Sequence, residues 1–335
     1  MSEQADCTFY EQHRGDVVFH GPPMVSHPNG GSETQVNQYK LSKQLGSGSF
    51  ARVFRATAPD PDNDSKCSTY AVKVINKKAL EKKREWKQAD GDGSPQLVSL
   101  FDRVITEVQI WEQLRCPNII GLKEVLDDDK TASLYLIMEH AHFGQIMVWQ
   151  PSKFSYTCPR IEEGVQLPHE LARHYFRDVI SAVHYLHECN IVHRDIKPEN
   201  ILVNHHHVCK LCDFGEAERF DPIVNESGML VETKGTHQFF PPECCRGGVP
   251  PTTNNGVVTF GASAAEPGAE AKESETAAAD KAVEFSGYAA DMWAVGVSLF
   301  ACLFGILPFY ATEPVQLFEM IGTDGFCLRC PGWPK

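Results

Sequence analysis

Two short runs of residues have the types and spacing that transfer of a phosphoryl group requires. Residues 193–200 read His-Arg-Asp-Ile-Lys-Pro-Glu-Asn, and a second run, Asp-Phe-Gly, begins at Asp213. In such a reaction Asp195 would accept the proton of the attacking hydroxyl, and Lys197 would neutralise charge on the phosphoryl group. Asn200 and Asp213 would hold Mg²⁺ through oxygen atoms. We discount a chance match because both runs occur in the expected order and spacing.

A lysine upstream of these runs lies where it needs a partner. Lys73 belongs to residues 70–75, an apolar stretch with strand character, in which an unpaired ammonium would be costly to bury. Glu107 lies on a predicted helix over residues 101–114, whose apolar side chains recur at three- or four-residue spacing. Such a pair orients the phosphates of ATP. The alternative is a surface lysine that extends its charged end into water.

A glycine-containing loop precedes that lysine. Residues 46–53 read Gly-Ser-Gly-Ser-Phe-Ala-Arg-Val and lie between two predicted strands. Backbone amides approach phosphate oxygens only where no side chain intervenes, so a loop that covers phosphates needs glycine. Ala51 stands at the third glycine position, and a simple hairpin turn is the alternative. The residues that would contact ATP here are Leu45, Gly46, Ser47, Gly48 and Ser49.

The surrounding pattern divides the chain into a strand-rich half and a helix-rich half. Stretches with strand character occur at residues 39–41, 53–55, 70–75 and 133–138. A helical stripe of apolar residues follows at residues 170–188. With 335 residues, 42% of them hydrophobic, the chain can form a sizeable core. We therefore expect an α+β fold.

Three segments interrupt this pattern. Residues 1–37 are polar and rich in Gly, Pro and Ser, which predicts a mobile, disordered tail. Residues 77–87 are dense in Lys and Arg, and residues 89–95 add Asp, Gly and Ser, which indicates an inserted loop. Residues 247–285 form a second insertion that we expect to be disordered, because its Ala- and Glu-rich composition offsets little of its ordering entropy.

Charge and hydropathy limit the classes of partner. The formal net charge of −13 argues against nucleic acid or an anionic membrane as the main partner. Residues 292–309 carry no charged side chain and could span a membrane, but we favour a buried core helix. The chain begins without a signal-like segment, so its 12 Cys residues predict free thiols in a reducing, cytoplasmic setting.

Together with Pro-Pro-Glu at residues 241–243, these motifs resemble those of the protein kinase family over residues 38–321. The resemblance implies a bilobal fold, with a β-rich N-terminal lobe at residues 38–138 and an α-rich C-terminal lobe at residues 142–335. It also implies an enzyme that uses ATP and Mg²⁺ and acts on protein substrates. Lys197 favours Ser/Thr over Tyr as the acceptor.

The same resemblance assigns further residues to the site. Those that would meet adenine are the gatekeeper Met138 and the hinge residues Glu139 and Ala141. Others around the nucleotide would be Glu199 and the apolar Val53, Ala71 and Leu202. Thr236 would support Asp195, and Asp291 would anchor the backbone of the catalytic loop. A spine of side chains joining the lobes would comprise Trp111, Leu122, His193 and Phe214.

A narrower resemblance is to the calcium/calmodulin-dependent protein kinase kinases and their fungal and protist relatives. It rests on Asn-Gln-Tyr at residues 37–39, Glu-Val-Leu-Asp-Asp at 124–128, Gly-Gln-Ile-Met at 144–147, and Phe-Ser-Gly at 285–287 before Asp-Met-Trp at 291–293. It implies that the substrates are activation loops of other kinases. Calmodulin is a further candidate partner, although no basic amphipathic helix follows the domain.

Some features depart from that subfamily. The first insertion is basic, whereas the subfamily's is rich in Arg, Pro and Gly. Glu199 replaces a small residue, and many basophilic kinases use a carboxylate there to attract a substrate arginine. His237 and Pro241 are also unusual. A catalytically impaired scaffold that binds nucleotide or partner proteins is the alternative function, but the intact catalytic set favours an enzyme.

Two clusters invite a zinc interpretation. The first is the histidine run at residues 205–207, near Cys209 and Cys212, where a β-hairpin turn is the alternative that we favour. The second is Cys-Leu-Arg-Cys at residues 327–330, which has two thiols and no matching pair.

The family pattern stops at Gly322. We therefore expect the C-terminal lobe to be truncated after about residue 321. Glu243 would then lack the arginine that pairs with it, and the apolar helix from Met292 would be partly uncovered.

Overall fold

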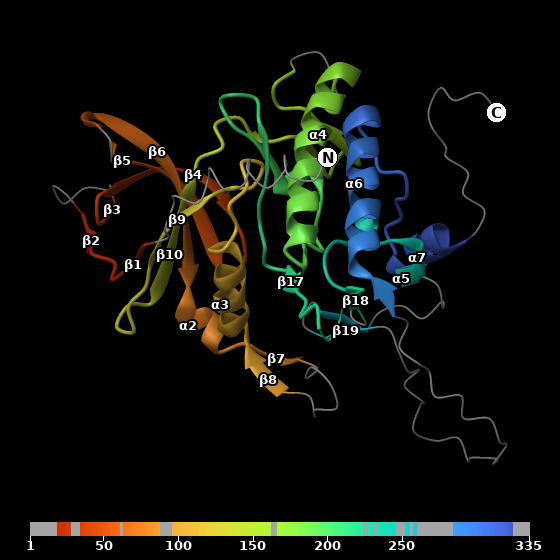
Figure 1. The fold of residues 1–335 in the computed structure, drawn as a ribbon, viewed down its shortest axis with the longest axis horizontal. Coiled ribbons are helices and arrows are strands. Elements are labelled where there is room, and N and C mark those ends of the chain that lie inside the picture. Colours follow the sequence, from red (N-terminus) through yellow and green to blue (C-terminus); the bar gives the residue numbers. More distant parts are fainter. Residues whose placement is uncertain are drawn as a thin grey trace, which may run out of the picture. The chain divides into compact units, whose positions relative to one another are not determined.

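The computed structural model describes residues 19–27, 34–60, 63–87, 96–161, 166–223, 225, 227–230, 233–245, 252–254, 257–259 and 284–323. The chain divides into two compact units. The first extends to Gly144 and includes Leu202–Gly215, and the second holds Gln145–Ile201 and the residues from Glu216 onward. Strands dominate the first unit and helices the second (Figure 1), which confirms the expected α+β class.

An eight-stranded sheet forms most of the first unit, in the order β1-β9-β10-β6-β5-β4-β3-β2. Its strands are β1 (Phe19–Gly21), β2 (Val25–Ser26), β3 (Gln35–Val36), β4 (Tyr39–Ser47), β5 (Ala51–Asp60), β6 (Asn63–Asn76), β9 (Leu122–Leu126) and β10 (Ser133–Glu139). Neighbouring strands are antiparallel, except that β1 runs parallel to β9. The core on this sheet includes Val36, Ala56, Val72, Leu126 and Ile137.

Part of the segment expected to be a tail belongs to this sheet. It supplies β1, β2 and β3, and Val36 is fully buried. The turn into β4 places Asn37 at a φ of 50°, a left-handed conformation that asparagine tolerates. The Asn37 side chain also accepts a hydrogen bond from the backbone N–H of Met24 at 2.6 Å. These local contacts correct the predicted start of the folded domain, and the rest of that prediction lies outside the described residues.

The first insertion begins as ordered structure. Its elements are α2 (Lys77–Glu81) and the paired strands β7 (Arg84–Lys87) and β8 (Gln96–Ser99), and the segment between these strands lies outside the described residues. Helix α3 (Leu100–Trp111) follows, as predicted. It starts with a capping box, in which the side chains of Ser99 and Asp102 each accept a hydrogen bond from the other's backbone N–H.

The second unit is built from helices α4 (His169–Glu188), α5 (Pro242–Cys245), α6 (Gly287–Phe304) and α7 (Pro314–Gly322), with 3₁₀ turns η2 (Pro198–Asn200) and η3 (His237–Phe239). Helices α4 and α6 lie side by side (Figure 1). Its paired strands are β12 (Val148–Gln150) with β13 (Ser155–Thr157), β14 (Ile191–Val192) with β17 (Glu218–Arg219), and β18 (Met229–Leu230) with β21 (Phe285–Ser286). Strands β15 (Ile201–Val203) and β16 (Cys209–Leu211) belong largely to the first unit, and with β11 (Gly144–Gln145) they form a small sheet in the order β11-β15-β16.

The second insertion contains one described pair of strands. β19 (Thr252–Asn254) pairs with β20 (Val257–Thr259), where the composition predicts disorder. The prediction is therefore corrected for these residues. The segment between β20 and Glu284 lies outside the described residues.

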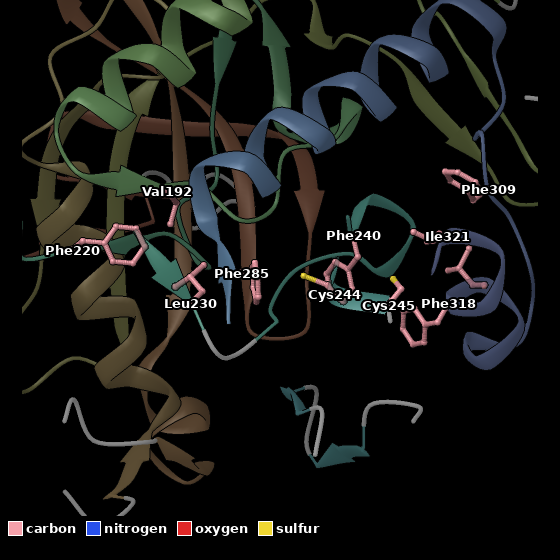
Figure 2. Close-up of a cluster of buried hydrophobic side chains, with 11 residues drawn as sticks. Val192, Phe220, Leu230, Phe240, Cys244, Cys245, Phe285, Phe309, Phe318 and Ile321 are labelled. Carbon is pink, nitrogen blue, oxygen red and sulfur yellow. The ribbon is translucent and has the colours of Figure 1, made fainter. Parts of the chain in front are cut away.

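A hydrophobic cluster joins residues between Phe220 and Cys245 to the last helices of this unit (Figure 2). Its buried side chains include Val192, Phe220, Leu230, Phe240, Cys244, Cys245, Phe285, Phe309, Leu317, Phe318 and Ile321. The rings of Phe240 and Phe318 stack with centroids 6.3 Å apart, which joins the segment before α5 to α7.

Helix α6 is long and apolar enough to span a membrane by length and composition. Several of its side chains are nevertheless buried inside the unit, among them the charged Asp291 and the apolar Ala294, Val295, Val297 and Ala301. This burial favours the core-helix interpretation.

The described part of the chain supports the hairpin interpretation of the first zinc candidate. The histidines lie in the turn between β15 and β16, where the Asn204 side chain accepts hydrogen bonds from the backbone N–H groups of His206 and Val208. Among the described residues, no group of three or more His, Cys, Asp or Glu could hold a metal ion, and nine cysteines there form no disulfide. The second zinc candidate and residues 324–335, on which the predicted truncation rests, lie outside the described residues.

Candidate active site

The predicted pair of Lys73 and Glu107 is present in the first unit. Lys73 Nζ, on β6, donates to Glu107 Oε1 at 2.7 Å and lies 3.8 Å from Asp213 Oδ1. Burial alone would lower the pKa of Lys73. The negative charges of Glu107 and Asp213 together have the larger effect, so the pKa of Lys73 is raised above its ordinary value. The ammonium is therefore held charged, and the alternative of a solvent-directed lysine does not apply.

Packing of α3 fixes the carboxylate in this pair. Glu107 is only 6% exposed. One turn further along α3, the indole N–H of Trp111 donates to the carbonyl oxygen of Ile120 at 2.6 Å. The Trp111 ring also lies 6.0 Å from that of Phe214, which follows Asp213. The predicted spine residues Trp111, Leu122 and Phe214 are buried in the first unit, and His193 is buried in the second.

The glycine loop is a hairpin between β4 and β5. Its turn is closed by a hydrogen bond from the backbone N–H of Gly48 to the carbonyl oxygen of Ala51 at 2.8 Å. A Cβ added at Gly46 would meet nothing within 4 Å, and one at Gly48 would have its nearest neighbour at 3.9 Å. The fold itself therefore does not need glycine at these positions, which favours a requirement imposed by a ligand that approaches the backbone.

Strand register brings the predicted adenine contacts together. Ala71 on β6 lies opposite Met138 on β10, and Val53 on β5 lies opposite Lys73. Because side chains alternate along a strand, Ala71 and Lys73 share a face of the sheet. The remaining predicted contacts of this unit are partly buried: Glu139, Ala141 and Leu202.

The predicted catalytic loop, residues 193–200 of the second unit, places hydrogen-bond donors around the Asp195 carboxylate. Lys197 Nζ donates to Asp195 Oδ2 at 2.6 Å and to Thr236 Oγ1 at 2.9 Å. Thr236 Oγ1 in turn donates to Asp195 Oδ1 at 2.7 Å. Each carboxylate oxygen of Asp195 is therefore fixed by at least one side chain, and the predicted support from Thr236 is present.

Asp291 on α6 holds the backbone of this loop, as expected. Its carboxylate accepts hydrogen bonds at 2.9 Å from the backbone N–H groups of His193 and Arg194. It also lies 2.9 Å from His187 Nε2 on α4. Arg194 has a left-handed φ of 67°. A non-glycine residue adopts this conformation only at a cost in free energy, so other contacts must hold it there. The hydrogen bond from the Arg194 N–H to Asp291 is such a contact, and Asp291 therefore helps to set the geometry of the loop.

The residues predicted to hold Mg²⁺ provide suitable oxygen atoms in each unit. The side-chain NH₂ group of Asn200 donates to the backbone carbonyl oxygen of Asp195 at 2.8 Å and to Asp195 Oδ2 at 3.0 Å. This leaves the amide oxygen of Asn200 as the group that can ligate a cation. In the first unit, the Asp213 side chain is 52% exposed. Carboxylate and amide oxygens are the ligands that Mg²⁺ takes, so each of these residues is chemically suited to the ion.

Comparison with known proteins identifies the family to which the chain belongs. The profile of the protein kinase domain family matches residues 39–263. The chain belongs to the protein kinase domain family.

Several eukaryotic kinases are similar to this kinase domain. A probable serine/threonine-protein kinase of Dictyostelium discoideum is 30% identical over 274 residues, which cover 82% of this chain and 30% of that protein. Serine/threonine-protein kinase ssp1 of Schizosaccharomyces pombe is 30% identical over 301 residues, 89% of this chain and 38% of ssp1. The calcium/calmodulin-dependent protein kinase kinase of Caenorhabditis elegans is 29% identical over 307 residues, 90% and 47% of the two chains.

The chain thus spans between 30% and 47% of the length of these three relatives. Their identities to this kinase domain are nearly equal although their names differ. The comparisons therefore establish the family and serine/threonine kinase relatives, and they do not resolve the subfamily.

Sequence reasoning missed two contacts of the kinase domain near the catalytic loop. The hydroxyl of Tyr156 donates to Glu199, 3.0 Å from Oε1 and 3.3 Å from Oε2. Burial raises the pKa of Glu199, against the effects of Tyr156 and Lys197. The buried guanidinium of Arg194 pairs with Glu218 on β17. No local signal marks these partners, because they lie 43 and 24 residues apart in the chain.

One missed contact had a local signal. Lys210 is buried between Cys209 and Leu211 on β16, and its Nζ lies 2.8 Å from Glu139 Oε2. A lysine within a short apolar strand needs a carboxylate partner, by the same reasoning that applies to Lys73. The side chain of the predicted hinge residue Glu139 is therefore paired with Lys210 within the first unit.

Proposed function

We propose that this chain is a serine/threonine protein kinase that transfers the γ-phosphate of ATP, with Mg²⁺, to hydroxyl groups of protein substrates. The arrangement around Asp195 carries the proposal. One carboxylate oxygen is held by Thr236 and the other by Lys197, so a proton acceptor and a cation lie side by side. A positioned carboxylate next to a lysine is what transfer to an alcohol requires.

Each residue has a defined part in this reaction. Asp195 takes the proton of the acceptor hydroxyl, and Lys197 stabilises the charge on the phosphoryl group during transfer. Lys73, held by Glu107, binds phosphate oxygens, and the amides of the glycine loop cover them. Bound ATP supplies the phosphoryl group, and Mg²⁺ neutralises charge on the phosphates.

For the substrate, we propose activation loops of other kinases in the cytoplasm. The motifs shared with the calcium/calmodulin-dependent protein kinase kinases support this class, and so does the similarity to the Caenorhabditis elegans enzyme of that name. Glu199 adds a preference for a basic residue close to the acceptor, since it immediately precedes Asn200 in the chain and its carboxylate would attract a positive charge. The cysteines of the described part form no disulfide, which supports a reducing compartment.

The test is transfer of radiolabelled phosphate to a panel of kinase domains that have been inactivated, so that all label comes from this chain. We expect label on activation-loop Ser or Thr residues. The control, Asp195→Asn, removes the proton acceptor and no predicted nucleotide contact, so turnover should fall by about 10² to 10⁴-fold while ATP binding persists. Near-normal turnover of the variant would contradict the role of Asp195. Label on generic peptides but on no activation loop would retain the kinase and reject the substrate class.

A further inference from the structure

A lysine of the first insertion contacts the glycine loop. Lys83 follows the end of α2 and is exposed. Its Nζ lies 4.7 Å from the centre of the Phe50 ring, over the face of that ring. Phe50 is the last residue of the turn in the glycine loop, directly before β5. The negative face of an aromatic ring attracts an ammonium at this distance, which is a cation–π interaction. The insertion therefore reaches the loop that would cover the phosphates of ATP.

The backbone of the same lysine is bound to the start of α3. The N–H of Leu100, the first residue of α3, donates to the carbonyl oxygen of Lys83 at 3.0 Å. The first N–H groups of a helix have no partner within the helix, and Lys83 satisfies one of them. Helix α3 carries Glu107, which holds Lys73. One residue thus joins, through its side chain and its backbone, two parts of the site that would bind phosphate.

Helix α2 gives Lys83 an anchored base. The Lys83 N–H donates to the carbonyl oxygen of Leu80 at 3.1 Å, and the Leu80 side chain is buried. At the start of α2, the buried Nζ of Lys77 donates to the carboxylate of Asp127, just after β9. Helices α2 and α3 also lie side by side (Figure 1). The side chain of Lys83 therefore extends toward the loop from a helix that is fixed to the sheet.

The glycine loop depends on contacts made by Phe50. The open space around Gly46 and Gly48 shows that packing does not hold the loop at these glycines. The carbonyl oxygen of Phe50 accepts a hydrogen bond from the Asn76 N–H at 3.0 Å. The side chain of Asn76 in turn caps α2. The backbone and the ring of Phe50 are therefore both connected to the first insertion.

We propose that Lys83 is a positioning residue for the nucleotide. Its ammonium holds the Phe50 ring, and with it the backbone amides of the glycine loop, in the position that covers the phosphates of ATP. A contact that orders the loop in advance reduces the ordering cost of binding. It should therefore raise the affinity for ATP and leave the affinity for adenosine, which has no phosphate, unchanged. This inference rests on the proposed function.

The test measures equilibrium binding of ATP with Mg²⁺, and of adenosine, to the full chain by calorimetry without an acceptor. Lys83→Gln should weaken ATP binding about twofold to fivefold, the size of an exposed cation–π contact, and leave adenosine binding unchanged. Lys83→Arg keeps a cation over the ring and should bind ATP as the wild type does. The matched control is Lys82→Gln, which removes the same charge from the neighbouring exposed position and should bind both ligands normally.

A second substitution separates the ring contact from a direct effect of charge. Phe50→Leu fills the position but removes the aromatic face, so it should weaken ATP binding about as much as Lys83→Gln. The double variant should bind ATP no more weakly than either single variant, because both changes remove one contact. If Lys83→Gln weakens ATP binding by the same factor in the Phe50→Leu background, the ammonium acts on the phosphates directly and the positioning proposal is wrong.

Phosphate transfer gives an independent readout. In Lys83→Gln the KM for ATP should rise by the factor seen in binding, while kcat stays within about twofold, because the catalytic loop is unchanged. The proposal is also wrong if Lys83→Gln binds ATP as the wild type does, or if it weakens adenosine binding equally. Weaker binding of ATP alone by this variant, in a chain that transfers phosphate to no protein, would support the positioning role and reject the proposed kinase function.

Discussion

Gly235 lies against the backbone of Arg194 and next to the proposed catalytic residue Asp195. Its φ is 104°, and an added Cβ would lie 2.3 Å from the carbonyl oxygen of Arg194 and 3.4 Å from Asp195 Oδ1. The next residue, Thr236, donates to Asp195. Any side chain at position 235 must therefore push the catalytic loop away from Thr236 or change the backbone conformation that presents Thr236.

We expect Gly235→Ala to lower turnover by about tenfold or more, because a displacement of roughly 1 Å at a catalytic group has costs of this order. It should also lower the melting temperature, since alanine is strained at this φ. The control is Gly296→Ala in α6, where an added Cβ meets nothing within 4 Å. That variant should be as active as the wild type and more stable by about 0.5–1 kcal/mol. Equal activity of both variants would contradict the assigned role of Gly235.

At the scale of elements, α6 is a support for the catalytic loop. Asp291 is 1% exposed and receives donors from the loop backbone and from His187 on α4. Ser298, also buried on α6, has a hydroxyl without a hydrogen-bond partner among the described residues. Helix α6 thus carries one buried polar side chain, Asp291, that binds the loop, and another, Ser298, whose hydroxyl binds no described group.

We expect Asp291→Asn to lower the free energy of unfolding by about 2–3 kcal/mol, because the amide NH₂ group cannot accept a hydrogen bond from a backbone N–H, and hydrogen bonds to charged groups contribute on this order. Turnover should fall as well, since the left-handed backbone at Arg194 loses its support. Ser298→Ala should change stability by less than about 0.5 kcal/mol or increase it. Urea unfolding and phosphate transfer measure both effects. A stable and fully active Asp291→Asn chain would contradict the anchoring role.

At the scale of the whole molecule, two histidines make stability depend on pH. Burial lowers the pKa of His237, whose ring contacts Phe240 and Phe318 in the second unit. In the first unit, burial and the nearby Arg55 lower the pKa of His140. The unfolded chain therefore binds more protons than the folded chain as pH falls through about 6.5, the ordinary histidine pKa, and stability decreases.

We expect the melting temperature to fall between pH 7 and pH 5.5, a range that spans the ordinary histidine pKa of about 6.5, and His237→Phe to reduce that fall. Phenylalanine keeps the ring contacts but takes up no proton. His140→Phe should act independently, because the two residues lie in different units. Parallel melting curves for wild type and double variant across this range would contradict the assignment.

The fold class and the contacts within most of the candidate site could be predicted from the sequence, because the motif residues lie close together in the chain. Asp195, Lys197 and Asn200 share one loop, and strand periodicity positions Lys73. Composition did not predict strands β1, β2 and β3, because only a few apolar residues and a turn at Asn37 fix this otherwise polar segment to the sheet. Tyr156 could not be predicted, since its partner Glu199 is defined only by the packing of the β12–β13 hairpin on the chain after α6.

The hydrophobic cluster of the second unit has a consequence for chain length. Cys245 and Phe285 both belong to it, so the ends of the segment that joins them are fixed in one core (Figure 2). The entropy lost in closing such a segment grows only with the logarithm of its length, and a doubling costs about 0.6 kcal/mol. Related chains can therefore lengthen or shorten this connection extensively. Such changes would leave the anchor of the catalytic loop in place, because the start of α6 is fixed after the insertion. Ser286 caps this helix by accepting a hydrogen bond from the Ala289 N–H at its hydroxyl oxygen.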